Sequence, residues 1–424
     1  MSDNSRREFL KKSIVLGATA ATSLSFPNIL HARNKYPTIK ILGTHVTLQE
    51  EIRLKAQKDL GINIEFYPGG SAEVMLKASL NPSSFDIYEQ WSNSIRPLWE
   101  AGSIKPINTK KLTYWDEVNS LSKTGKISKN AKYGAGDSPN KILYIQKDGS
   151  LSSKPTDEIS FNPYVHNVDS FGYNSDVIPK GIAYETESWG WLLDEKNHGR
   201  VALVNEPTIG IFDAALAVQA KGLMKFKDIG NMSRLEVDEL FRILIEYKKK
   251  GHFRGVWSSV PHSVELMSKN QVDIESMFSP AVSALNGEGI PCVYAAPKEG
   301  YRAWHGVQCL SSETTGEREE AAYAYMNWWL SGWAGAFIAR QGYYISNPQR
   351  SRSFMSQAEW DYWYDGKMAS VNLRGTDGKI SVHKGDIRNG GSYIKRFENI
   401  AVWNSVMPTY DYTLDKWNEF VLAR

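Results

Sequence analysis

VDIESMFSPAVSALNGEGIPCVYAAPKEGYRAWHGVQC, residues Val272–Cys309, has the most informative pattern in this chain. Its first seven residues, Val272–Phe278, alternate between two faces, which predicts a strand. Pro280 ends that strand, and we expect a short helix after it. A second strand is predicted over Pro291–Ala296, before the loop Pro297–Gly300. The stretch therefore predicts a strand, a helix and a strand in succession.

The same alternation of strands and helices extends toward the N-terminus. Strands are predicted over Thr38–Gly43, Ile62–Tyr67 and Phe85–Glu89. Thr47 followed by Glu50 predicts a capping box for the first helix between them. Short connections of this kind predict an α/β fold with a parallel sheet covered by helices on both faces. Ligands of such sheets bind beyond the carboxyl ends of the strands, which carry Thr44 and His45, Gly69–Ser71, and Gln90–Asn93.

The N-terminus carries an export signal. Ser5–Lys11 reads SRREFLK, with the pair Arg6 and Arg7 before an apolar residue, a Leu and a Lys, and an apolar run covers residues 13–26. This pattern is typical of a twin-arginine signal peptide. We expect residues 1–32 to be removed and the mature chain to lie in the periplasm.

Charge and hydropathy limit the classes of partner. The formal net charge of +3 falls to +1 when residues 1–32, with four basic and two acidic side chains, are removed. Such a balance indicates neither nucleic-acid binding nor attachment to an anionic membrane surface. No later apolar run approaches the roughly 20 residues of a membrane-spanning helix. The length predicts about two domains.

The only two cysteines, Cys292 and Cys309, lie symmetrically about the junction of Gly300 and Tyr301. If the flanking strands paired as a hairpin, the thiols would face each other, and the periplasm permits a disulfide. Two separate buried thiols are the alternative interpretation. The sequence leaves both open.

Motifs of catalysis and of metal binding are missing from the sequence. No HExxH, CxxC, GxSxG or phosphate-binding loop occurs, and His252 and His262 are the nearest internal pair of histidines. We therefore predict no enzymatic activity, no cofactor and no metal site.

Four segments, in order, resemble the periplasmic polyamine-binding proteins of bacterial ABC importers. The third of them along the chain is the opening stretch, where Phe278, the PKEG loop and Trp304 take the places of ligand-lining residues in that family. The others are Asn162–Pro179, with its Tyr173, Asn174 and Asp176; Ser188–Pro207; and Ala324–Pro348. The resemblance covers residues 37–348. It implies the two-lobed, type II periplasmic-binding-protein fold, in which discontinuous lobes are joined by a hinge.

The resemblance also implies where the chain passes between lobes. We expect crossings near Tyr164, near Phe278 and after Tyr344. Residues 33–164 and 279–345 would then form lobe 1. Residues 165–278 and 346–424 would form lobe 2 with a C-terminal extension.

The family holds polyamines between aromatic rings and pairs their ammonium groups with carboxylates. This chain keeps the rings and lacks several acids, because Thr44-His45-Val46 stands where the family has Trp-Thr-Glu, and no acid follows Phe278 directly. Ring faces without a second carboxylate suit a quaternary ammonium or sulfonium group, through cation–π attraction. The predicted ligand-binding residues of this aromatic cage are His45, Trp91, Asn93, Asp169, Trp257, Ser258, Phe278, Tyr301 and Trp304.

These residues predict the monomeric substrate-binding component of an ABC importer, which delivers its ligand to an inner-membrane permease. The favoured ligand is a methylated onium zwitterion such as betaine or dimethylsulfoniopropionate, whose carboxylate would meet Arg302 or the amides of Gly69–Ser71. One alternative is a polyamine (putrescine or spermidine) receptor that uses Asp169, Glu206 and Glu185 or Glu187. The alternative from another class is an exported carbohydrate hydrolase with a carboxylate pair.

Overall fold

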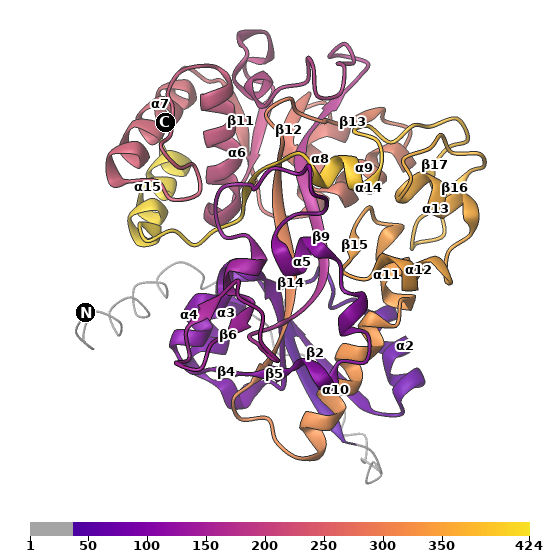
Figure 1. Ribbon diagram of the computed structural model, residues 1–424. Coiled ribbons are helices and arrows are strands. Elements are labelled where there is room, and N and C mark those ends of the chain that lie inside the picture. Colours follow the sequence, from indigo (N-terminus) through magenta and orange to yellow (C-terminus); the bar gives the residue numbers. More distant parts are fainter. Residues whose placement is uncertain (1–36) are drawn as a thin grey trace, which may run out of the picture.

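Two long strands, β9 (Asn162–Asn174) and β14 (Tyr301–Ser311), run through the middle of the molecule (Figure 1). The structure is a computed structural model that describes residues 37–424, so the predicted twin-arginine signal lies outside the described residues. Every residue of both strands is buried. The two strands pair antiparallel and belong to one twelve-stranded mixed sheet, which has one half on each side of them.

The first half of the sheet has the order β14-β3-β1-β2. β1 is parallel to both β2 and β3, as the short strand–helix–strand connections predict, and β3 is antiparallel to β14. Its strands are β1 (Thr38–Gly43), β2 (Asn63–Pro68), β3 (Ile87–Trp91) and β4 (Ile104–Lys105). Its helices are α2 (Glu50–Leu60), α3 (Ser71–Leu80), α4 (Ile95–Glu100), α5 (Ser120–Thr124), α10 (Glu317–Leu330) and α11 (Trp333–Ala339).

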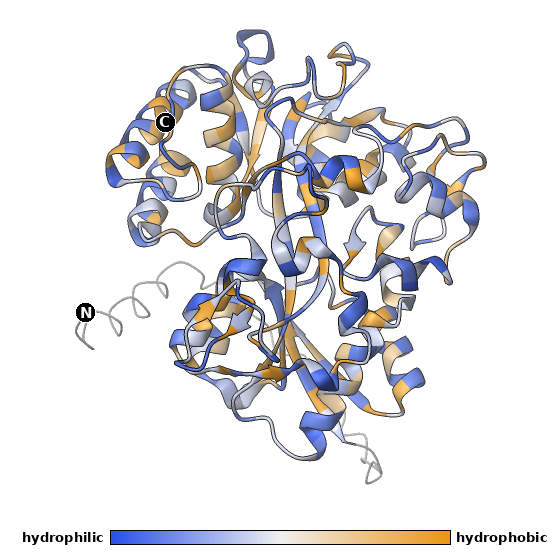
Figure 2. Cartoon of the chain, in the orientation of Figure 1, coloured by the Kyte–Doolittle hydropathy of each residue, from blue (hydrophilic) through white to orange (hydrophobic). Residues whose placement is uncertain are grey.

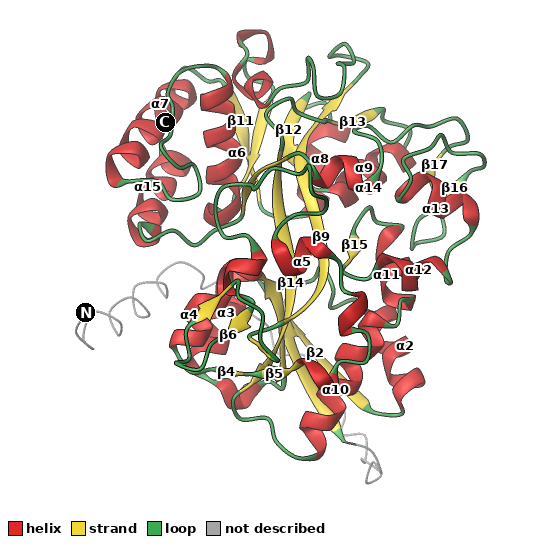
Figure 3. Ribbon diagram, in the orientation of Figure 1, coloured by secondary structure: helices red, strands yellow, loops and turns green. Residues whose placement is uncertain are grey.

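The second half has the order β11-β10-β12-β9, with β13 also paired to β9. Its strands are β10 (Val201–Val204), β11 (Phe253–Trp257), β12 (Ile274–Met277) and β13 (Cys292–Tyr294). Its helices are α6 (Pro207–Ala220), α7 (Arg234–Lys249), α8 (Val260–Ser268), α9 (Ser279–Gly287) and α15 (Tyr410–Leu422). Figure 3 shows helices beside both halves, so each half forms an α/β layered unit with its own apolar core. The α/β prediction is therefore confirmed.

Residues 346–405 form a C-terminal excursion beside the crossing strands. Its elements are α12 (Pro348–Arg352), α13 (Gln357–Trp363), β16 (Leu373–Arg374), β17 (Ile380–Val382), α14 (Tyr393–Phe397) and β18 (Ile400–Trp403), which follow β15 (Tyr344–Ile345). β18 pairs with β14, and β15 pairs with β9. An aromatic core joins the excursion to both strands through Val168, Tyr301, Trp363 and Tyr393. The excursion spans the two halves on one side of the molecule (Figure 1).

The remaining elements are short. A small four-stranded sheet has the order β5-β8-β6-β7. Its strands are β5 (Ile107–Asn108), β6 (Tyr144–Ile145), β7 (Leu151–Ser152) and β8 (Glu158–Ile159). The 3₁₀ turns are η1 (Pro82–Ser84), η2 (Ser92–Ser94), η3 (Thr109–Lys111), η4 (Trp115–Glu117), η5 (Pro139–Ile142), η6 (Trp189–Leu193) and η7 (Glu195–Asn197). In Figure 2 apolar colouring concentrates on the strands and the inner sides of the helices.

The strand pairing places the second crossing later than expected. The sequence predicts that residues 279–345 share one lobe, but β13 pairs with β9 at Gly172–Asn174, beside β12. Residues 279–300 therefore lie with the second half, and the chain returns along β14. After residue 345, α15 packs on the second half, against α6 and α7, while the excursion contacts both halves, with β17 against α9 and β18 paired to β14.

Two local predictions meet different outcomes. The Thr47 hydroxyl contacts Glu89 and Tyr164, and α2 begins after Gln49 with no side-chain cap, so the first predicted capping box is wrong. The cysteines are both free and buried. β13 pairs with the second-half end of β9, whereas Cys309 pairs opposite Tyr88 of β3, so no hairpin brings the thiols together. Within residues 37–424 no helix is long and apolar enough to cross a bilayer.

Candidate functional site

The two halves touch where their strands end. The Ser71 hydroxyl at the start of α3 donates to Glu206 Oε1 before α6, at 3.3 Å. Trp91, the last residue of β3, packs against the apolar clusters of both halves. The carboxyl ends of the parallel strands therefore meet at one junction, as expected for ligand sites of α/β sheets. We call the residues gathered there the junction site; they are Trp91, Asp169, Glu206, Asp213, Trp257, Phe278, Arg302, Trp304 and Tyr343.

Aromatic rings enter the junction site from both halves. Trp304 makes edge contacts with Trp91, at 6.4 Å between ring centroids, and with Tyr343, at 5.5 Å. In the second half Trp257 makes an edge contact with Phe278, at 5.0 Å. Arg302 lies beside the second group, with its guanidinium carbon 5.9 Å from the centre of the Phe278 ring. The rings thus form two clusters, and a buried cation contacts one of them.

Arg302 is fully buried and holds two carboxylates. Its Nε donates to Asp213 Oδ1 at 2.7 Å, and its Nη1 lies 3.4 Å from Asp169 Oδ2. Nη1 also donates to the side-chain oxygen of Asn404, at 3.2 Å. Arg302 Nη2 and Asp213 Oδ2 have no hydrogen-bond partner within residues 37–424. Since buried polar atoms are nearly always satisfied, a donor and an acceptor remain for a bound group.

Burial shapes the charge of the junction site. It raises the pKa of Asp213 to about 6, against the opposing effect of Arg302. It also raises the pKa of Asp169, although Arg302 and the hydroxyl of Tyr294 favour the carboxylate. The pKa of Glu206 is raised by burial too, and Thr208 and Ser71 oppose that shift. Asp169 and Asp213 thus share one guanidinium, and Glu206 is a third buried carboxyl group that senses its charge.

The structure brings together five of the predicted ligand-binding residues. Trp91, Asp169, Trp257, Phe278 and Trp304 all belong to the junction site. Asn93 is buried close by in η2, and its Oδ1 has no partner among the described residues. His45 and Ser258 are exposed residues that follow β1 and β11.

Tyr301 does not belong to the junction site. Strand residues alternate between faces, so Arg302 and Trp304 point toward the site, and Tyr301 points into the core of the C-terminal excursion. There its hydroxyl lies 3.2 Å from the hydroxyl of Tyr184 and accepts from Nη1 of Arg396 at 3.4 Å. Its prediction as a ligand-lining residue is corrected by this orientation.

The four acids proposed for a polyamine ligand lie in different parts of the structure. Asp169 and Glu206 lie at the junction, whereas Glu187 is buried elsewhere, with Tyr173, Asn389 and the Ala296 amide as donors. Glu185 is exposed. Sequence reasoning missed Asp213 and Tyr343. The signal for Asp213 was its position as the one acid in the otherwise apolar helix α6.

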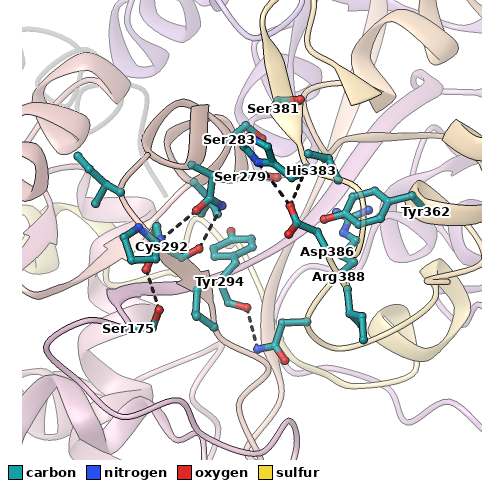
Figure 4. A pocket seen from close by; sticks show the side chains of 18 of the residues that line it. Ser175, Ser279, Ser283, Cys292, Tyr294, Tyr362, Ser381, His383, Asp386 and Arg388 are labelled. Atoms are coloured by element: carbon teal, nitrogen blue, oxygen red, sulfur yellow. Dashed lines mark hydrogen bonds and ion pairs between the residues drawn. The ribbon is translucent and has the colours of Figure 1, made fainter. Parts of the chain in front are cut away.

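A separate cavity of about 550 Å³ lies between the second half and the C-terminal excursion. In Figure 4 Ser175, Cys292 and Tyr294 lie on one side of it, and Tyr362, Asp386 and Arg388 on the other. Arg388 donates to the carbonyls of Trp363, at 3.0 Å, and Gly342, at 3.1 Å. Tyr294 lines this cavity while its hydroxyl donates to Asp169 at 3.0 Å. The cavity wall thus contacts the junction site.

Solved structures share this fold. The spermidine/putrescine ABC transporter substrate-binding protein PotD of Streptococcus pneumoniae matches with a TM-score of 0.58 and 12% identity, over 91% of this chain and 99% of that one. The TpPotD lipoprotein of Treponema pallidum matches with a TM-score of 0.61 and 11% identity, over 90% and 99%. A GABA receptor matches with a TM-score of 0.56 and 14% identity, over 92% and 98%. At such identities the likeness shows the fold alone.

Sequence comparison identifies the family. No curated protein sequence matches the chain significantly. The family model of the bacterial extracellular solute-binding proteins matches residues 53–362, which run from within α2 to within α13 of the excursion. Members of that family serve as substrate-binding components of ABC transporters. The chain therefore belongs to the bacterial extracellular solute-binding protein family and has the two-lobed periplasmic-binding-protein fold.

Proposed function

We propose that the junction site binds a small organic cation or onium zwitterion for an ABC importer. The observation that carries this proposal is the arrangement of three carboxyl groups and two aromatic clusters, from both halves, around Arg302. A cation there gains from ring faces and from the excess of carboxylates. A ligand that touches both halves stabilises their closed arrangement, which the permease recognises.

A methylated onium zwitterion is the favoured ligand. Its methyl groups need no hydrogen-bond acceptor, so ring faces such as those of Trp304 and Trp91 suffice. Its carboxylate would accept from Arg302 Nη2, the guanidinium nitrogen without a partner in the described chain. Betaine and dimethylsulfoniopropionate have this chemistry.

A second candidate, a polyamine or another primary amine, is favoured by Asp213. Its Oδ2 is a buried acceptor without a partner among residues 37–424. An ammonium group has N–H donors that would satisfy it, whereas a fully methylated onium group has none. Glu206, at the contact between the halves, offers a further carboxylate.

The strand pairing supports a hinge between the two halves. We infer that residues 37–169 and 302–345 move as one lobe, and that residues 170–301 and 406–424 move as the other. We further propose that the protein is exported to the periplasm by the twin-arginine route, acts as a monomer and has no catalytic activity. Measured hydrolysis of a carbohydrate would replace the transport function with an enzymatic one.

Ligand titration tests this function. The purified protein is unfolded and refolded to remove any carried ligand, and its tryptophan fluorescence is followed during addition of putrescine, spermidine, glycine betaine, choline and dimethylsulfoniopropionate. We expect a Kd of about 1–10 μM or tighter for an onium zwitterion, a typical range for selective small-ligand binding. Binding of polyamines alone would select the second candidate. Silence across the panel would overturn the cation proposal.

A further inference from the structure

Three residues far apart in the sequence meet at the outer end of the second half. Glu195 begins η7 and His198 follows it, and His252 lies between α7 and β11. One ligand atom of each lies within 4.8 Å of the other two. The Glu195 carboxylate and His198 Nδ1 are 3.8 Å apart. The sequence predicts no metal site, because these three residues form no linear motif. Only the fold brings them together.

His252 is prepared to bind through one nitrogen. Its Nε2 lies 2.8 Å from the carbonyl oxygen of Leu192, and a carbonyl only accepts, so Nε2 carries the proton. Nδ1 then holds the lone pair, and it is buried without a partner among the described residues. Edge contacts with Tyr247, at 5.1 Å, and Phe253, at 5.2 Å, fix the ring. Histidines that bind a metal through one ring nitrogen usually donate the N–H of the other nitrogen to an acceptor such as a backbone carbonyl, as His252 does.

The surroundings leave room for an ion. A cavity of about 290 Å³ adjoins the three residues. Two cations that line it are already paired: Arg242 with Glu239 at 2.7 Å, and Lys250 with Glu246 at 2.7 Å. Glu195 and His198 have exposed side chains, so small rotations can bring their ligand atoms to the 2.0–2.2 Å typical of zinc, about the fixed His252.

We propose that Glu195, His198 and His252 bind a divalent transition-metal ion such as Zn²⁺, with water completing the coordination. Two imidazoles and a carboxylate are ligands that zinc accepts. The ion would link the turn at η7 to the corner between α7 and β11. It would stabilise the second half without entering the junction site, so the proposal stands apart from the ligand proposed above.

Calorimetric titration with zinc chloride tests the site on the full chain without an affinity tag. We expect about one ion per chain, with a Kd that is micromolar or tighter. His198→Ala and Glu195→Gln should each weaken binding at least about tenfold, since both remove a ligand without disturbing a buried side chain. His262→Ala is the matched control, because His262 is an exposed histidine on α8 outside the cluster, and it should leave the Kd unchanged.

Cobalt gives an independent readout. Added Co²⁺ should produce visible absorption bands that His198→Ala removes and His262→Ala keeps. Zinc should also raise the melting temperature of the parent and of His262→Ala, but not of His198→Ala. The proposal is overturned if the parent binds no zinc at about 1 mM, or if zinc binding survives His198→Ala undiminished.

Discussion

Arg302 and Asp169 stand directly opposite each other on β14 and β9, the two strands that pass between the halves of the molecule. Their side chains form a buried ion pair with 3.4 Å between Nη1 and Oδ2. Because Arg302 also holds Asp213 of α6, at 2.7 Å, one guanidinium connects both crossing strands to a helix of the second half. The same residue carries the unpartnered nitrogen of the junction site.

Loss of this guanidinium should destabilise the fold strongly. Arg302→Met would leave Asp169 and Asp213 buried without their cation, and breaking a buried pair in this way costs about 3–5 kcal/mol. Arg350→Met is the control, since Arg350 pairs with Glu117 at the surface, and such pairs contribute about 0–1 kcal/mol. Urea unfolding of both variants measures the two costs. Equal costs would contradict the role assigned to Arg302.

The Trp304 ring should be needed for ligand binding. Trp304→Ala removes the ring that contacts both Trp91 and Tyr343, and we expect affinity to fall at least about tenfold, the value of one desolvated cation–π contact of about 1.4 kcal/mol. Trp304→Phe should retain part of the affinity. Trp333→Ala, which alters a tryptophan of α11 outside the junction, should bind as the parent does. Isothermal titration calorimetry measures the Kd of each variant, because removal of a tryptophan changes the fluorescence signal itself.

Ligand affinity should rise with pH through the range in which Asp213 ionises. The pKa of Asp213 is raised to about 6, and a cation favours the carboxylate, so binding below that pH must first release a proton. The Kd should therefore increase by up to about tenfold for each pH unit below pH 6. Asp213→Asn should make the profile flatter. Titrations between about pH 5 and 8 measure it, and identical profiles for parent and variant would contradict this assignment.

Stability should depend on pH through Glu89. Its carboxyl group is buried beside Thr47, Tyr164 and Gln308, and burial raises its pKa from 4.5 to about 7. The folded state then holds the proton more tightly than the unfolded state. This contribution is fully present below pH 4.5 and is lost as pH rises through 7, an effect of about 3 kcal/mol.

Glu89→Gln should remove that dependence. Between about pH 4.5 and 8, the parent should lose about 3 kcal/mol of unfolding free energy relative to the variant. Urea unfolding at each pH gives the difference directly. A constant difference between the two proteins would show that Glu89 does not titrate as described.

Much of the fold follows from patterns within short segments. β1 occupies the predicted residues Thr38–Gly43, because its apolar residues lie between clear turn signals. β14 covers Tyr301–Ser311, although Arg302 and His305 interrupt the apolar pattern of its sequence. Those polar side chains are buried through partners in distant segments, Asp213 for Arg302 and Ser122 for His305. Such partners cannot be seen in a local pattern.

The candidate site was predictable where strand position decides it. Trp91 and Trp257 end strands, and Phe278 follows one, so the rule for strand ends places all three at the junction. Tyr301 was placed on the wrong face because the parity of β14 depends on its pairing with β9 and β18. A shift of one residue reverses every side chain of a strand. Asp213 was missed because its partner, Arg302, lies 89 residues away.

A crystal structure of the protein with its tightest-binding onium zwitterion would show whether the junction site binds the ligand. We expect the onium group against Trp304, the carboxylate on Nη2 of Arg302, and contacts to Phe278, so that one molecule touches both halves. A ligand found instead in the cavity beside Tyr294 and Arg388, with the junction site unchanged, would contradict this expectation.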